Sequence, residues 1–346
     1  MGKDGKMRIE ICRDSAKWDA YVASMPAASN YHRWSWKHVI EDTFNHEAFY
    51  LAAFEGDAIQ GILPLFRMKS RLFGHFLVSI PFFSRGGILA GDSITTDALF
   101  GHAAELAGDL GVSHIELRQG APVSTGWQDT NAKIIMEVEL PRTVQELSDR
   151  LSPKMRKRIR FARKSGLEPQ WAGAEAIGSF YSVFSTNMRN LGTPVYPQSW
   201  FENFFRRFPN EIKILNLNEG RKTVASALVS IYRDTVELPW AATLAESREK
   251  FSPLLQYWTL LEWALENGYK RVDLGRCTPG SGNHEFKKRW ECVETSLHWY
   301  YWLAEGRTVP QLRPDNPKFR LATGVWKRLP LSVANLLGPR IVRSIP

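Results

Sequence analysis

The chain has 346 residues, 44% of them hydrophobic and 12% aromatic, which is enough for sizeable cores and predicts about two domains of ordinary size. Its longest apolar runs, such as residues 76–83, are too short to span a bilayer, and its N-terminus lacks the apolar region of a signal peptide. The three cysteines, Cys12, Cys277 and Cys292, form no CxxC pair, which argues against a disulfide framework. We therefore expect a cytoplasmic protein that is soluble or at most peripheral to a membrane.

The formal net charge of +9 favours anionic partners, namely nucleic acid, nucleotide-linked substrates or acidic lipid surfaces. The charge is concentrated in residues 154–164, which hold seven Lys or Arg and no acid. As a helix, this segment places Met155, Ile159 and Ala162 on one face. It is either a solvated helix between two domains or an electrostatic seat for RNA or a phosphorylated carrier.

The first half of the chain alternates between strand patterns and helix patterns. Period-two runs and turn residues predict strands, and apolar residues at helical spacing predict helices. The expected order is a strand and short helix in 7–28, a helix ending at 44, a hairpin of 49–54 and 58–66, a strand at 76–84, a helix at 96–110, and strands at 114–117 and 132–140.

The second half repeats this order. After the basic segment the expected elements are helices at 175–191 and 198–208, a hairpin of 213–217 and 223–232, a strand at 235–242, a loop at 243–252, a helix at 253–267, a strand at 271–274, a loop at 275–282, a short helix at 284–290 and a strand at 295–302. The sequence therefore predicts two copies of one α/β (α+β) topology, in domains 1–145 and 146–305, each a mixed and mostly antiparallel sheet flanked by helices. A basic tail, 306–346, follows.

The stretch from 236 to 302 has the strongest indication of a binding site. Ser252 can N-cap the helix at 253–267, Pro253 suits its first turn, and Gly268 can end it. A helix start and a turn-rich loop then fall at the ends of neighbouring strands, where free N–H groups attract anions and polarised carbonyls. This pattern predicts a site for an acyl or phosphate-bearing ligand, although many α/β units begin in the same way.

The tail is polar and proline-marked at first and then mixes apolar residues with cations. No acid follows Asp315. The tail either docks back on the body of the protein or lies on an anionic membrane surface as a basic amphipathic element.

Several long motifs carry a family resemblance. They are FYSVFSTNMRNLGTPVYP at 180–197, LPWAATL at 238–244, the stretch LLQYWTLLEWALENGYKRVDLGRCTPGSGNHEFKKRW at 254–290, and the basic KMRKRIRFARKSG. Together they resemble the FemAB (FemABX) family of tandem GNAT-fold acyltransferases, most closely the subgroup associated with PEP-CTERM/exosortase and exopolysaccharide systems. The resemblance implies amide-forming transfer of an acyl group to an amine. In cell-wall members the donor is an aminoacyl-tRNA and the acceptor is a peptidoglycan precursor.

The resemblance also implies site residues. The family's Phe-Lys motif matches Phe286 and Lys287, so that Lys287 would stabilise the transition state, and Arg189 and Tyr196 are candidates for acceptor binding. Three further candidates come from the residues themselves. Arg276 could bind a carboxylate or phosphate, or pair with Asp273; Trp240 could be a ligand platform or plain core; His284 could transfer a proton. No metal-ligand cluster is visible, and no tightly bound cofactor is expected.

The sequence leaves the acyl donor open between aminoacyl-tRNA and acyl-CoA. The coiled-coil insertion associated with tRNA handling in some family members is missing, which disfavours tRNA. The loop before residue 253 has no glycine and carries Glu246 and Glu249, which disfavours a CoA pyrophosphate. Three hypotheses follow: a FemAB-like N-acyltransferase or aminoacyltransferase acting on an anionic cell-envelope or exopolysaccharide precursor, an ordinary CoA-dependent GNAT N-acyltransferase, or a non-enzymatic module that binds RNA or a membrane surface.

Overall fold

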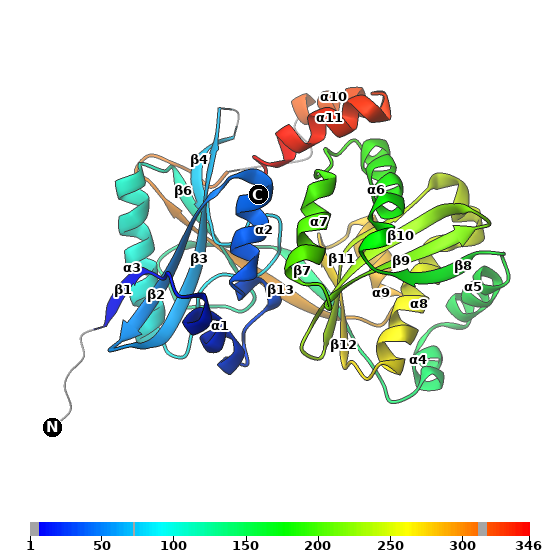
Figure 1. Cartoon of the computed structure of the whole chain (residues 1–346), viewed down its shortest axis with the longest axis horizontal. Coiled ribbons are helices and arrows are strands. Elements are labelled where there is room, and N and C mark those ends of the chain that lie inside the picture. The colour runs from blue at the N-terminus through cyan, green and yellow to red at the C-terminus, as the bar shows by residue number, and fades with distance from the viewer. Residues whose placement is uncertain (1–6, 72, 311–316) are drawn as a thin grey trace. The chain divides into compact units, whose positions relative to one another are not determined.

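A computed structural model describes residues 7–71, 73–310 and 317–346 of the chain (Figure 1). The chain divides into two compact units. Unit 1 comprises residues 1–132, 296–312 and 343–346, and unit 2 comprises residues 133–295 and 313–342. The chain passes from the first unit to the second within β7 (Gln128–Glu139) and returns within β13 (Val293–Leu303).

Unit 1 is built on a mostly antiparallel sheet with the strand order β1-β2-β3-β4-β6-β13. Only β4 and β6 run parallel. Its other strands are β1 (Arg8–Ile11), β2 (Glu47–Glu55), β3 (Ala58–Ser70), β4 (Gly74–Val78), β5 (Leu89–Ala90, paired to β3) and β6 (His114–Gln119). Its helices are α1 (Ser15–Ser24), the short η1 (Asn30–His32), α2 (Ser35–Phe44) and α3 (Ser93–Leu110).

The fourth strand of unit 1, β4, is shorter than the sequence predicts. The apolar run 76–84 suggests one strand, but β4 ends at Val78 and the chain then turns through Phe82, whose φ is +74°. The buried guanidinium of Arg118 accounts for the bend, because its Nη1 donates to the carbonyls of Ile80 (3.2 Å) and Phe83 (2.6 Å). A buried apolar loop and a buried strand have the same composition, so the pattern alone could not separate them.

Unit 2 repeats the sheet, with the strand order β7-β12-β11-β10-β9-β8 and only β11 and β12 parallel. Its further strands are β8 (Glu168–Ala172), β9 (Ile212–Glu219), β10 (Lys222–Tyr232), β11 (Thr235–Thr243) and β12 (Arg271–Cys277). Its helical segments are α4 (Val144–Arg150), α5 (Pro153–Arg163), η2 (Ala174–Ala176), α6 (Ile177–Leu191), α7 (Gln198–Arg207), η3 (Ala245–Lys250), α8 (Ser252–Glu266), α9 (Gly282–Lys288), α10 (Pro317–Trp326) and α11 (Leu331–Val342).

The last strand of each half of the chain joins the sheet of the other half. β7 follows β6 in the sequence but pairs with β12, for example Val138 with Val272. β13 follows α9 but pairs with β6, for example Tyr300 with Leu117. Two units that are topologically repeated therefore exchange their final strands, which domain boundaries drawn along the sequence do not reveal.

The basic helix of unit 2 forms as its sequence predicts. Ser152 caps α5 by accepting from the Met155 N–H, and Pro153 occupies the first turn. Met155, Ile159 and Ala162 are the buried residues of this helix, and Met155 and Ile159 join the core formed by α8 and one face of the sheet. The apolar face is therefore packed, and of the exposed cations of α5 Arg163 pairs with Glu262, which leaves Lys154, Lys157 and Arg160 available for another role.

The tail packs onto the body of unit 2, as one of the two interpretations predicts. α11 contacts α6, and Figure 1 shows α11 (red) above α6 (green). Gly338 is the closest approach, since a Cβ at this position would lie 2.8 Å from the backbone N and 2.9 Å from the backbone O of Val195. Ala334 and Val342 are buried on the same face of α11.

Gly338→Ala is therefore expected to destabilise unit 2 by about 1–3 kcal/mol, because the new methyl would overlap backbone atoms that cannot rotate away. Urea unfolding measures this change. Gly324→Ala in α10 is the matched control, since a Cβ there meets nothing within 4 Å and alanine favours a helix. Equal unfolding midpoints for Gly338→Ala and the unchanged chain would show that α11 does not pack as described.

None of the helices in the described parts of the chain is long and apolar enough to cross a membrane.

Candidate active site

The two parallel strands of unit 2 pair over only three residues. Thr235, Val236 and Glu237 of β11 face Arg271, Val272 and Asp273 of β12, and beyond them both strands continue without pairing to each other. Two residues explain why the ladder stops. Pro239 has no N–H to donate, and Gly275 (φ +81°) lies in an irregularity of β12 between Asp273 and Arg276.

Lys287 reaches this point of divergence from α9. Its Nζ donates to the carbonyls of Gly275 (2.9 Å) and Arg276 (3.1 Å), and only 3% of the residue is exposed. Ser281 fixes the start of α9 by accepting from the His284 N–H. A lysine ammonium has three donors, so one N–H remains for an oxygen brought in by a substrate.

Burial lowers the pKa of Lys287 from its usual value of 10.5, and the positive charge of Arg276 acts in the same direction. Cys277, Asp273 and Cys292 oppose this shift. The carbonyl oxygens of Gly275 and Arg276 accept hydrogen bonds from the Lys287 ammonium and so favour its charged form. The Asp273 carboxylate also lies close enough to stabilise this charge. The group is thus a preorganised cation with little competing water.

The lowered pKa predicts the alkaline limb of the pH–rate profile. If the ammonium form acts on the substrate, kcat/KM should fall with rising pH at an apparent pKa below 10.5, because deprotonation removes the charge. The assay should use an acceptor amine of low pKa, so that the titration of the acceptor does not fall in the same pH range as that of Lys287. Lys288→Met, at the exposed neighbouring position, should leave the limb unchanged. A rate that stays level up to the usual lysine pKa would contradict a role for the Lys287 charge.

His284 is held in place by its neighbours. Its Nδ1 accepts from the Gly280 N–H (3.0 Å), so the proton is on Nε2, which donates to Glu294 Oε1 (3.0 Å). The ring is 7% exposed. These contacts suit a residue that fixes the loop between β12 and α9, and they occupy both nitrogens that proton transfer would need.

Arg276 lies next to Lys287 in a cluster of cations that also includes Lys133 of β7. Lys133 Nζ donates to Thr278 Oγ1 at 2.5 Å. Burial is the main cause that lowers the pKa of Lys133, and Arg276 adds to it. Lys133 could not be predicted from the sequence, because it belongs to the exchanged strand and is far from the loop along the chain.

Tyr196 and Trp240 come together in an aromatic cluster on the opposite side of the sheet from α8. Their ring centroids are 5.9 Å apart, and Trp240 also contacts Phe201 and Phe204 of α7, both at 5.4 Å. Trp240 and Tyr196 are only partly buried, so part of each ring is open to a ligand.

Arg189 and Phe286 have other surroundings. Arg189 Nη1 donates to the carbonyl of Leu329, which connects α6 to the tail. Phe286 packs edge-on against Tyr257 (4.9 Å) and lies 6.4 Å from Trp290, so it supports α9 from the core side. The structure therefore groups Lys287, Arg276 and His284 around one loop, places Tyr196 and Trp240 together, and sets Arg189 beside the tail.

Two buried carboxylates mark the end of the parallel ladder. Glu237 and Asp273 are register partners, and each is 5% exposed. Asp273 Oδ1 accepts from the Gly275 N–H at 2.7 Å and so shapes the turn that Lys287 contacts. Glu237 was not among the predicted site residues, although an acid within an otherwise apolar strand, TVELPWAA, was a usable signal.

The start of α8 differs from the predicted anion site. The loop expected at 243–252 contains the short helix η3, and the residue before α8 is Phe251 in the left-handed conformation (φ +54°). Ser252 does not cap the helix as predicted; its hydroxyl hydrogen-bonds Ser247 Oγ at 2.7 Å, and both serines are fully buried. The approach to these helix N–H groups is thus covered by the protein itself.

In unit 1, a buried ion pair fills the corresponding divergence of parallel strands. The β4–β6 pairing ends at Val78 and Glu116, and the guanidinium of Arg118 (1% exposed) lies beyond it, with Nε donating to Glu116 Oε1 at 2.7 Å. Tyr301 donates to the other oxygen of Glu116 at 2.9 Å. These side chains satisfy one another, so they form a structural network.

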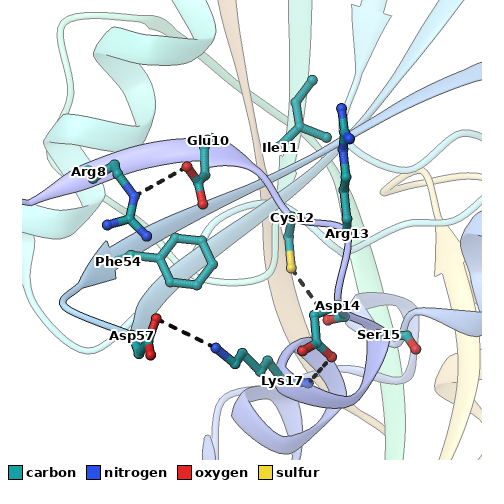
Figure 2. Close-up of a pocket in the computed structure, with 10 residues that line it drawn as sticks. All are labelled: Arg8, Glu10, Ile11, Cys12, Arg13, Asp14, Ser15, Lys17, Phe54 and Asp57. Atoms are coloured by element: carbon teal, nitrogen blue, oxygen red, sulfur yellow. Dashed lines mark hydrogen bonds and ion pairs between the residues drawn. The ribbon is translucent and has the colours of Figure 1, made fainter.

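A separate open depression in unit 1 lies beside β1 and the start of α1 (Figure 2). Its charges pair locally, Arg8 with Glu10 (3.2 Å) and Lys17 with Asp57 (3.8 Å). None of the predicted site residues lines it. In the described parts of the chain, no group of three or more His, Cys, Asp or Glu side chains is arranged to hold a metal ion.

Comparisons with known proteins bear on the fold of the chain. Residues 153–288 match the family described as acetyltransferase (GNAT) domain. The chain is similar in fold to the crystal structure of FemX, with a TM-score of 0.68 at 14% identity, covering 86% of this chain and 97% of FemX. No curated protein matches it by sequence.

Two further solved structures share the fold. L-PGS from Bacillus licheniformis has a TM-score of 0.57 at 15% identity and covers 93% of this chain and 100% of its own. A tandem GNAT protein from the clavulanic acid biosynthesis pathway has a TM-score of 0.56 at 12% identity, with 88% and 100% covered. The predicted fold class is confirmed: two tandem GNAT-like α/β domains, the fold of acyltransferases.

Proposed function

We propose that the chain is an N-acyltransferase that forms an amide on an amine of a cell-envelope or exopolysaccharide precursor, with its chemistry in unit 2. The observation that carries this proposal is the buried ammonium of Lys287. It lies where β11 and β12 stop pairing, with two N–H groups held by carbonyls and one left for a substrate. The match of residues 153–288 to a GNAT acetyltransferase domain and the resemblance to the FemAB family support it.

The reaction follows from this geometry. The acceptor nitrogen attacks the carbonyl carbon of the donor ester or thioester, and the carbonyl electron pair moves onto oxygen. The remaining Lys287 N–H and its positive charge stabilise that oxyanion, which is the step where preorganised donors contribute most. The intermediate then collapses, the bond to the donor's oxygen or sulfur breaks, and the amide forms.

The attacking nitrogen must lose a proton, which ends on the leaving group. We assign this proton transfer to Glu237 and Asp273, the two buried carboxylates where β11 and β12 stop pairing. They are adjacent on neighbouring strands at the same end of the ladder. Tyr196 and Trp240 would offer the acceptor an aromatic surface, which suits a sugar or another ligand with an apolar face.

We infer that the donor is an aminoacyl-tRNA. Lys154, Lys157 and Arg160 are exposed on α5 and Lys164 directly after it, and in the described part of the chain no acid pairs with any of them. Phe161, also exposed (56%), lies among these four cations. Cations that can contact phosphates, together with an aromatic ring that can stack on an unpaired base, are typical of single-stranded nucleic-acid binding.

Acyl-CoA is the second candidate donor, favoured by the GNAT acetyltransferase match. The structure at the start of α8 disfavours an acyl-CoA donor. Ser247 and Ser252 occupy the space at the helix N-terminus, and Glu246 is on the preceding turn, paired with Lys222. A pyrophosphate needs open backbone N–H groups at this place.

Incubating the purified chain with a simple amine and either charged tRNA or acyl-CoA distinguishes the two donors. Saturable binding of charged tRNA and its amine-dependent deacylation would support the proposal. Consumption of acyl-CoA with no response to tRNA would replace the tRNA donor with CoA. The absence of transfer from either donor would refute the proposed enzyme in both forms.

A further inference from the structure

The outward face of α11 is apolar. Val333, Leu336 and Leu337 are 36%, 63% and 36% exposed, and their spacing places them on one stripe of the helix. The opposite face, with Ala334, Gly338 and Val342, is the one packed into unit 2. The helix therefore has two apolar faces, and the protein itself covers one of them.

One exposed cation lies on this stripe, and two more precede α11 in the chain. Arg340 lies seven residues after Val333 and so on the same stripe, and it is exposed. Lys327 and Arg328, at the end of α10, are exposed beside Val325, which is itself 56% exposed. Residues 317–346 contain six Lys or Arg and no Asp or Glu, so no negative charge of the tail offsets them.

We propose that this surface, Val333, Leu336, Leu337 and Arg340 with Lys327 and Arg328, docks the protein on an anionic lipid bilayer. Leucine and valine side chains at the level of the acyl chains, with cations at the level of the headgroups, are the arrangement of interfacial helices. The anionic surface supplies the charge that the tail lacks. A soluble protein partner of no particular charge would match the apolar stripe but would leave the exposed cations Lys327, Arg328 and Arg340 unexplained.

The exposed face of the basic helix α5 differs from the exposed face of α11. Its apolar face, Met155, Ile159 and Ala162, is buried, and its exposed face carries cations with a single phenylalanine. α11 instead exposes a continuous apolar stripe that ends in one cation, Arg340. A bilayer needs the second arrangement, because apolar burial and charge must act together for stable binding.

This inference does not depend on the proposed transfer reaction, because it rests only on side chains of the tail. If the membrane docking and the transfer reaction are both correct, the acceptor amine belongs to a precursor carried on a lipid, and the docked tail brings unit 2 to the membrane surface. Loss of vesicle binding and loss of amide formation are separate readouts, so one proposal can fail while the other stands.

The test is sedimentation of the full chain with vesicles of phosphatidylcholine alone or of phosphatidylcholine mixed with phosphatidylglycerol. Binding should be at least about tenfold stronger to the anionic vesicles and should weaken with salt, since each cation near the surface contributes about fivefold. Leu336→Gln/Leu337→Gln should lower binding to the anionic vesicles by at least about tenfold. Ile94→Gln is the matched control, because Ile94 is 75% exposed on α3, outside the tail.

Several results would overturn the inference. One is equal binding to neutral and anionic vesicles, and another is unchanged binding of the double variant. A third is lipid-independent self-association that Leu336→Gln/Leu337→Gln abolishes while vesicle binding is absent, which would make the stripe a protein interface. Should the double variant unfold, Lys327→Gln/Arg340→Gln provides a second test, with an expected loss on anionic vesicles of more than about tenfold.

Discussion

Lys287→Met is expected to lower kcat by about 10²–10³-fold while the affinity for the donor stays near its original value. Methionine keeps most of the length of the side chain and removes only the ammonium, which is the group that would meet the developing oxyanion. The residue is 3% exposed, so water cannot easily replace the lost donor. Single-turnover transfer to an amine measures the chemical step directly.

The control must separate chemistry from folding. Lys287 Nζ also donates to the carbonyls of Gly275 and Arg276, and losing these bonds should cost about 1–3 kcal/mol of stability. Unfolding midpoints and donor binding should therefore accompany each rate. Lys288→Met carries the same change at an exposed neighbouring position and should remain active. Full activity of a folded Lys287→Met protein would remove Lys287 from the mechanism.

Lys157→Gln/Arg160→Gln/Phe161→Ala should weaken binding of charged tRNA on the order of 10²-fold at low salt. Two phosphate contacts and one stacking contact are lost, and none of the three residues is buried. The slope of log K against log salt concentration should become shallower by about 1.4–1.8, because binding through two fewer cations releases fewer counterions from the tRNA.

A second pair of cations gives the matched comparison. Arg206→Gln/Arg221→Gln removes the same charge from exposed positions on α7 and the β9–β10 turn. This variant should bind tRNA nearly as the unchanged chain does. If both variants lose affinity equally, the attraction is a property of net charge and not of the α5 surface.

Much of the fold could be predicted because its elements follow local rules. The periodicity of α3, α6, α7 and α8 and the two hairpins agree with the sequence expectation within a few residues. The buried face of α5 is also as predicted. The elements that were missed include α4, which Thr143 caps by accepting from the Glu146 N–H, and β8, whose EPQWA sequence is polar because it is an edge strand with little burial.

What the sequence could not show depends on partners distant along the chain. The exchange of β7 and β13 cannot be predicted from local sequence, since the residue pattern of each strand would fit either sheet. The Ser247–Ser252 hydrogen bond replaces a cap that the local sequence favours. The sequence also could not show that Gly280 and Glu294 hydrogen-bond the two ring nitrogens of His284, whose role in proton transfer stays a prediction.

The candidate site was partly visible in advance. The loop between β12 and α9 and its lysine follow from the motif GRCTPGSGNHEFKKRW. The burial of Lys287 and the neighbouring carboxylate Glu237 required the three-dimensional arrangement, because Glu237 is fifty residues earlier in the sequence. Arg189 shows the opposite case, since a motif position that suggested acceptor binding is engaged with the tail at Leu329.

The most direct measurement is mass spectrometry of the products after the chain is incubated with isotope-labelled aminoacyl-tRNA and a panel of amines. The account predicts an alkali-stable amide that carries the labelled acyl group, formed by the unchanged chain and nearly absent with Lys287→Met. Free amino acid alone, released at equal rates by both proteins, would contradict acyl transfer at Lys287.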